Sequence, residues 1–127
     1  MDRLLDADIL IELLRGSPDA QAWLISLPQA PGVSGLAAME LFQGCHNKAE
    51  TRDVERLLRP FTIIWPSEVD MQRALGAFPV LFLRDGTGLL DMLTAQTAIG
   101  HGLTLCTFNL KHFKAISGLA LEAPYVR

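Results

Sequence analysis

Apolar residues along this chain follow two alternating patterns, which are short continuous runs and helical repeats. The first run, residues 3–6, predicts a short strand that ends on an acid, Asp6. From Asp8 onward the apolar positions recur at helical spacing and share one side of a predicted helix: Ile9, Leu10, Leu13 and Leu14. The chain therefore begins with a strand followed directly by a helix.

The same change of pattern repeats several times along the sequence. Gly16 ends the first helix, and Ser17 with Pro18 gives the typical start of a second. We expect further helices at residues 18–27, 36–48, 51–59, 67–83, 89–100 and, as a short turn, 109–113. We expect further strands at residues 33–34, 61–65, 103–107 and, at an edge, 119–125. Helices that alternate with short apolar strands predict an α/β fold around a parallel twisted sheet.

Composition narrows the class of protein. The chain has 127 residues, half of them hydrophobic and a fifth charged, which suits one compact domain over residues 1–127. No run approaches the roughly 20 apolar residues that span a bilayer, and no apolar signal segment is seen, so we expect a cytoplasmic protein without membrane contact. Cys45 and Cys106 lack zinc-site spacing and are expected to be small buried residues.

The net charge argues against a protein that coats DNA. The chain carries 14 acids and 11 bases, for a net charge of −3, whereas DNA-coating proteins usually have a basic surplus. If three acids hold a metal ion, the remaining charges balance. RNA is therefore not excluded as a substrate.

Three acids occupy positions where acids are unusual. Asp6 ends an apolar strand, Glu40 lies on an Ala- and Leu-rich helix, and Asp91 opens another apolar helix. In parallel sheets ligands collect at the carboxyl ends of the strands, and Asp6 and Asn109 lie at such ends. Carboxylates gathered there repel one another unless a cation is bound, and oxygen ligands without His or Cys favour Mg²⁺ or Mn²⁺. Such a cluster suits hydrolysis of phosphodiester bonds.

Each acid also has a simpler structural explanation. Asp6 or Asp8 would cap the following helix, Asp91 would offset a helix dipole, and Glu40 would lie on a solvated face. Spacing alone leaves both interpretations open.

Three segments add a resemblance to a known family. LLDADILIELLRG (residues 4–16) resembles the opening of PIN domains, especially VapC-type toxins of bacterial toxin–antitoxin pairs. SGLAAMELFQG (residues 34–44) resembles their second motif, and residues 86–113 resemble the third and fourth. The four motifs occur in the family's order over nearly the whole chain.

The resemblance implies a three-layer α/β/α sandwich and a function. It implies that Asp6, Glu40 and Asp91 bind the metal, that Asn109 takes a fourth catalytic position where many relatives carry Asp, and that Thr107 orients a carboxylate or water. We expect a metal-dependent endoribonuclease whose products carry 5′-phosphate and 3′-hydroxyl ends. The resemblance also implies a homodimer and a small antitoxin partner, whose plausible contacts are Leu13, Leu14 and Trp23.

Several neighbouring residues keep two interpretations. Asp8 either adds charge to the cluster or caps the helix, and we expect the cap. Asp85 is a further possible acid, expected to be solvated. Three cations flank the predicted site and are candidates for RNA backbone contact or ordinary surface charges: Arg15, Lys111 and Lys114. His112 would touch a phosphate or simply pack, and His101 is expected to face a helix end.

Two rival functions remain at this point. In the first, the chain keeps the fold but acts as a weakly catalytic or non-catalytic binding and regulatory module. The presence of Asn109 in place of an acid favours this function. Alternatively it would cut DNA flaps, which the short length and the absence of a DNA-binding extension disfavour.

Overall fold

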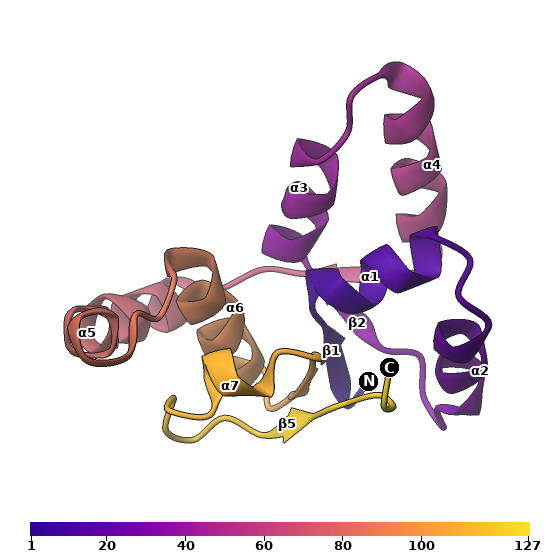
Figure 1. Cartoon of the computed structure of the whole chain (residues 1–127). Helices are drawn as coiled ribbons and strands as arrows, with labels where there is room; N and C mark the ends of the chain where they lie inside the picture. Colours follow the sequence, from indigo (N-terminus) through magenta and orange to yellow (C-terminus); the bar gives the residue numbers. More distant parts are fainter.

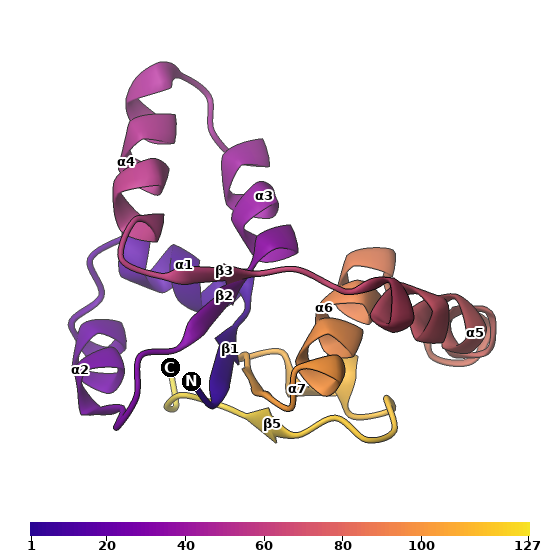
Figure 2. The same cartoon turned by 180° about the vertical axis from the view of Figure 1, so that it is seen from behind.

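The computed structural model describes all 127 residues and contains a five-stranded sheet with helices on both faces (Figures 1 and 2). The strands are β1 (Arg3–Leu5), β2 (Gly32–Ser34), β3 (Thr62–Ile64), β4 (Thr104–Cys106) and β5 (Leu121–Glu122). The helices are α1 (Ala7–Leu14), α2 (Pro18–Ser26), α3 (Gly35–Gln43), α4 (Lys48–Leu58), α5 (Glu68–Asp85), α6 (Leu89–Gly100) and α7 (Leu110–Phe113).

The sheet is entirely parallel, with the strand order β3-β2-β1-β4-β5. The first strand of the chain is thus the central one, paired with β2 on one side and with β4 on the other. Between two parallel strands the chain must cross back over a face of the sheet, and the helices lie in these connections. The predicted α/β/α architecture is confirmed.

The alternation of side chains along the strands divides the core into two halves. Leu5 and Cys106 belong to a buried cluster with α1 to α4, whereas Leu4 and Leu105 belong to a second cluster with α5, α6 and α7. Successive residues of a strand point to opposite faces of the sheet, so two neighbouring residues place one side chain in each half of the core. The central strands therefore hold the two helical layers together.

Some predicted element boundaries are wrong. The helix expected at residues 36–48 ends at Gln43, because Gly44 closes it, and Asn47 begins α4 by accepting a hydrogen bond from the Glu50 N–H at 2.9 Å. The expected edge strand at residues 119–125 is reduced to two residues of β5. None of the helices combines the length and apolar character needed to cross a membrane.

Candidate active site

Asp6 lies where the central strand ends and α1 begins. One carboxylate oxygen, Oδ1, accepts a hydrogen bond from the Ala7 N–H at 2.8 Å, so Asp6 is the N-cap of α1. The residue is only 7% exposed. The capping and functional interpretations of Asp6 are therefore compatible, because capping uses one oxygen and leaves the other free for a further interaction.

Thr107 brings the neighbouring strand end to Asp6. Its hydroxyl lies 3.1 Å from Asp6 Oδ2 and 3.1 Å from Asp8 Oδ2, and it accepts a hydrogen bond from the Asn109 N–H at 3.1 Å. A hydroxyl has one proton, so it can fully satisfy only one of the two carboxylates. The expected orienting role of Thr107 agrees with this geometry.

Asp8 is not a helix cap, and this part of the sequence-based expectation is wrong. It lies inside the first turn of α1, and Asp6 occupies the cap position. Its Oδ2 instead accepts a hydrogen bond from the Phe108 N–H at 2.8 Å and lies within hydrogen-bond distance of the Thr107 hydroxyl. Its Oδ1 is buried without a partner. The repeated acid in Asp6-Ala7-Asp8 at a strand end was the available signal for this second carboxylate.

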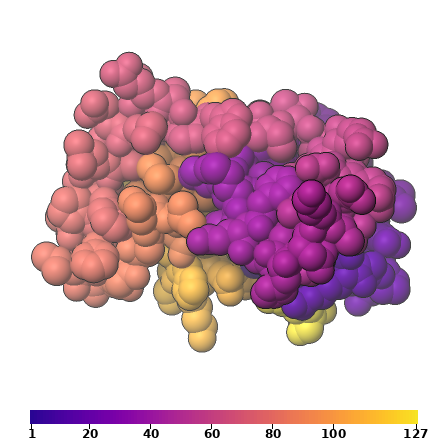
Figure 3. Space-filling model, turned by 90° about the horizontal axis from the view of Figure 1, so that it is seen from above, coloured from indigo at the N-terminus to yellow at the C-terminus, as the bar shows by residue number.

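Glu40 and Asp91 reach the same edge of the sheet from two helices. Glu40 lies half-buried near the end of α3, and Asp91 lies half-buried in the first turn of α6. The two helices are in contact, and Figure 3 shows α3 beside the recessed α6 when the molecule is viewed from above. The Nδ1 atom of His112 on α7 lies 3.6 Å from Asp91 Oδ2. The structure therefore brings all three predicted metal ligands to the carboxyl edge of the sheet.

The acids at this edge raise one another's pKa values. Burial, followed by the charge of Asp8, raises the pKa of Asp6 to about 7, despite hydrogen bonds from Ala7 and Thr107. Burial and then Asp91 and Asp8 raise the pKa of Glu40. Burial also raises the pKa of Asp91, which His112 lowers in part and Asp8 raises. The four carboxylates thus form one electrostatic group, which we call the acid cluster: Asp6, Asp8, Glu40 and Asp91.

The acid cluster has the chemistry of a divalent cation site, although its carboxylates do not converge on one point. No three His, Cys, Asp or Glu side chains of the chain converge closely enough to hold an ion. The donors are carboxylate oxygens, and Asp8 Oδ1 is buried without a hydrogen bond. A cation would reverse the repulsion that raises the pKa values. The residues present therefore fit Mg²⁺ or Mn²⁺ if their side chains rearrange.

The other predicted residues lie around the acid cluster with fewer contacts. Asn109 is exposed, and its backbone N–H reaches Thr107 while its side chain makes no hydrogen bond. Asp85 ends α5, is exposed as expected, and pairs with Arg84 at 2.8 Å. Lys114 is exposed without an ion pair. His101 ends α6, with Nδ1 2.9 Å from the Thr97 carbonyl oxygen, which agrees with its expected place at a helix end.

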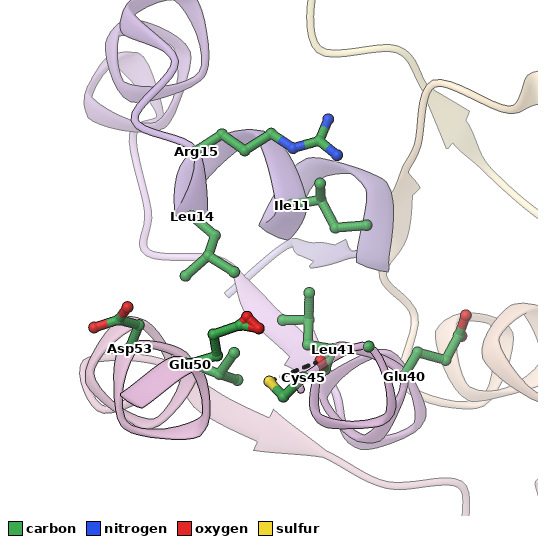
Figure 4. Close-up of a pocket in the computed structure, with 10 residues that line it drawn as sticks. Ile11, Leu14, Arg15, Glu40, Leu41, Cys45, Glu50 and Asp53 are labelled. Atoms are coloured by element: carbon green, nitrogen blue, oxygen red, sulfur yellow. Dashed lines mark hydrogen bonds between the residues drawn. The ribbon is translucent and has the colours of Figure 1, made fainter. Parts of the chain in front are cut away.

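Two hollows adjoin the acid cluster. The first, about 500 Å³, lies between α1, α3 and α4 and is lined by apolar residues such as Ile11, Leu14 and Leu41 with Arg15 on its rim (Figure 4). Glu40 lies at its border, on the side of α3 away from Cys45. The second, about 290 Å³, is mostly polar and is lined by Asp91, Lys111 and His112 together with the loop between α5 and α6. We call these the apolar groove and the polar hollow.

Comparison with known proteins places the chain in a family. A family model described as the PIN domain matches residues 3–119. Ribonuclease VapC10 from Mycobacterium tuberculosis (strain ATCC 25618 / H37Rv) is 39% identical over 114 residues, covering 87% of this chain and 84% of that protein.

Solved structures give the same result. A toxin–antitoxin complex from Klebsiella pneumoniae has a chain that is 29% identical, with a TM-score of 0.78 and 98% of each chain covered. VapBC2 from Rickettsia felis, bound to a DNA fragment from their promoter, has a chain that is 25% identical, with a TM-score of 0.80 and 97% and 98% of the two chains covered. Sequence motifs, fold and relatives agree, and the chain belongs to the PIN-domain family.

Proposed function

We propose that this protein is a metal-dependent endoribonuclease of the VapC type. The observation that carries the proposal is the acid cluster, in which burial, together with neighbouring carboxylates, raises the pKa values of Asp6, Glu40 and Asp91. A fold gains nothing in stability by gathering like charges at one partly buried edge. Identity of 39% with a ribonuclease, over most of both chains, supports RNA as the substrate.

Asp6, Glu40 and Asp91 would hold the cation, with Asp8 close behind them. A bound Mg²⁺ or Mn²⁺ supplies a Lewis acid that polarises the phosphoryl group and acidifies water. Thr107 holds the orientation of Asp6 and Asp8 through its hydroxyl. Asn109 offers a neutral amide at the edge of the cluster, so the side chains around the cation carry less charge than they would with a fourth acid. Attack by water on phosphorus, with the 3′ oxygen leaving, gives 5′-phosphate and 3′-hydroxyl ends.

The test is cleavage of a pool of small RNAs by the purified protein in Mg²⁺, in Mn²⁺ and in EDTA. The Asp91→Asn variant should lose cutting, whereas Asp53→Asn, which changes an exposed acid on α4 paired with Arg56, should keep it. Cleavage that persists in EDTA, or products with a 2′,3′-cyclic phosphate, would contradict the proposal. Sequencing the product ends also identifies the preferred RNA.

The proposed partner is a small antitoxin that occupies the apolar groove. The groove has apolar walls and acids at its edge, among them Glu50 and Asp53, so it suits an amphipathic segment with basic residues. Because Glu40 borders the groove, an occupant would extend toward the acid cluster and obstruct it. Leu14 lines the groove, whereas Leu13 is buried in the core. Trp23 is half-buried against that core and does not line the groove.

Co-expression with the neighbouring small open reading frame tests this partner. A stable complex should form, and Leu14→Glu should weaken it. Ile25→Glu changes a residue that is 83% exposed on α2, away from the groove, and should leave the complex intact. Two proteins that elute separately would count against the antitoxin.

A second copy of the chain is the proposed partner for the apolar surface formed by α5 and α6. Met71 and Leu75 on α5 and Leu89 on α6 are more than half exposed and line an apolar hollow of about 440 Å³. Patches of this kind mark protein contacts. Light scattering should give the mass of a dimer, and Leu75→Glu should give a monomer. A wild-type monomer at micromolar concentration would rule out this homodimer.

One observation favours the non-catalytic alternative. The acid cluster does not converge into a ligand set, and Asn109 adds no charge to it. Titration with Mn²⁺ separates the two functions. A nuclease should bind the ion in a manner that requires Asp6, whereas a pure binding module has no such requirement.

A further inference from the structure

We propose that the polar hollow is a second phosphate site, which binds the RNA backbone beside the bond that is cut. This inference rests on the proposed nuclease function, because it assigns a role to the surroundings of Asp91. It is carried by the start of α6, by one unpartnered hydroxyl and by two basic side chains. Asp91 of the acid cluster forms one wall of the same hollow.

The start of α6 is open to a ligand. Gly88 is its N-cap residue, and no side chain caps its first N–H groups, although each of the other helices of eight or more residues has a capping side chain: α1, α2, α3, α4 and α5. Uncapped N–H groups carry partial positive charge and bind phosphate oxygens well. Because Gly88 has no side chain, the backbone at this point is also accessible.

An unpartnered hydroxyl gives the second observation. Thr87 is only 5% exposed, its hydroxyl makes no hydrogen bond within the chain, and the residue lines the polar hollow. The hydroxyl oxygen is not enclosed by the protein, so it is open to donate a hydrogen bond to a ligand beside the uncapped start of α6. A phosphate oxygen would accept from the Thr87 hydroxyl and from the N–H groups of α6 together.

The charges around the hollow favour an anion once the neighbouring acids are neutralised. Lys111 and His112 line it on the α7 side, and both are exposed to an incoming ligand. Asp85 is already paired with Arg84 at 2.8 Å. Asp91 forms the wall toward the acid cluster, and a cation there would offset its charge. The hollow is therefore placed to hold a phosphate of the same strand as the bond that is cut.

Only eight residues line this hollow, and one of them is hydrophobic. An apolar pocket would select a base or a protein side chain, whereas this lining suits a charged and hydrated group. Contacts to a phosphate fix the position of an RNA strand and carry no sequence information. The site should thus increase the affinity for RNA and fix the position of the strand, without selecting a base sequence.

The first experiment uses inorganic phosphate and amide NMR of the protein in saturating Mg²⁺. Saturable shifts are expected for the N–H groups of Leu89, Leu90 and Asp91, and Thr87→Val should weaken phosphate binding about tenfold. Thr87→Ser, which keeps the hydroxyl, should bind as the wild type does. Shifts that do not saturate, or that survive Thr87→Val unchanged, would overturn the proposal. This readout does not depend on cleavage, so it remains decisive even if the nuclease function fails.

The second experiment measures binding of a fluorescent RNA oligonucleotide at several salt concentrations. Lys111→Gln should lower the slope of log K against log[salt] by about one, as expected for one lost phosphate contact. Lys48→Gln removes the same charge from α4, away from the hollow, and should leave the slope unchanged. Equal slopes for wild type and Lys111→Gln would exclude Lys111 from the site.

Discussion

Two carboxylates, Asp6 and Asp70, are buried to nearly the same extent, at 7% and 2% exposure, but have opposite surroundings. Asp70 starts α5 in a capping box, accepting from the Ser67 N–H at 2.9 Å and from Arg73 at 2.8 Å. Burial alone would raise the pKa of Asp70, but these hydrogen bonds outweigh it, and the pKa is lowered. For Asp6, burial and a neighbouring acid raise the pKa to about 7.

The difference separates a structural acid, Asp70, from Asp6, the acid for which we propose a function. Asp70 has its partners within the chain and is stable as an anion. Asp6 has some hydrogen bonds but is surrounded by other acids, so its charge is unsatisfied until a cation or a proton arrives. Exposure alone would not have distinguished the two, whereas the direction of the pKa shift does.

The largest expected effect separates the two acids by activity. Asp6→Asn should lower RNA cleavage by about 10³-fold, because a metal ligand is lost and several kcal/mol of transition-state stabilisation go with it. Asp70→Asn should retain the wild-type rate per folded molecule. Initial rates, corrected for the folded fraction by circular dichroism, measure this. Equal losses in the two variants would erase the distinction.

The next largest effect is on the stability of the fold, and it tests how closely Gly100 packs against Asp70. A side chain at Gly100, at the end of α6, would place its Cβ 1.7 Å from Asp70 Oδ1. Gly100→Ala should therefore destabilise the fold by about 3 kcal/mol, as overpacking does. Gly76→Ala, in α5 with nothing within 4 Å, is the matched control and should stabilise by about 0.5–1 kcal/mol. Urea unfolding gives both values, and a neutral Gly100→Ala would contradict the close packing.

The third effect concerns the pH dependence of the Asp70 network. A lowered pKa in the folded state means that Asp70 stabilises the fold above its ordinary pKa, and that this contribution disappears as the pH falls. Asp70→Asn should cost about 1–2 kcal/mol at pH 7, since Arg73 is partly exposed, and progressively less in acid. Thermal unfolding at pH 7 and pH 3 measures the change. If the loss of stability in Asp70→Asn were the same at both pH values, packing and not charge would explain it.

The smallest effect has the opposite sign. The raised pKa of Asp6 means that the metal-free fold is favoured while Asp6 is protonated and loses stability as the pH rises toward and through about 7. Asp6→Asn keeps the helix cap and removes the charge, so it should stabilise the EDTA-treated protein by about 1 kcal/mol at pH 8 and hardly at all at pH 4. Calorimetry in EDTA tests this, and destabilisation at pH 8 would contradict the raised pKa.

Sequence reasoning predicted the features that depend on local pattern. The parallel sheet, the strand ending on Asp6 and the helices bearing Glu40 and Asp91 follow from apolar periodicity and from a resemblance in motifs, and the structure contains all of them. The end of α3 was misplaced, although Gly44 and Asn47 are ordinary signals for the end of one helix and the start of the next. Boundaries depend on small differences in capping, which periodicity does not measure.

The features that escaped prediction depend on contacts between distant residues. Asp8 appeared to be a cap because its partners, Thr107 and Phe108, lie about a hundred positions along the chain. Sequence pattern alone explains Asp70 as an acid in the first turn of a helix, and its burial against Gly100 is not visible in that pattern. The roles of the acid cluster and the single-domain organisation over residues 1–127 remain predictions.

The central position of β1 has a consequence for how the protein is made on the ribosome. Residues 3–5 pair with residues 104–106, which are synthesised about a hundred positions later. Likewise, the hydroxyl of Thr107 that contacts Asp6 lies 101 positions further along the chain. Such long-range pairing is slow and comes late in folding. A chain that has not yet reached residue 107 therefore contains Asp6 and Asp8 without the hydroxyl that lies between them in the folded protein.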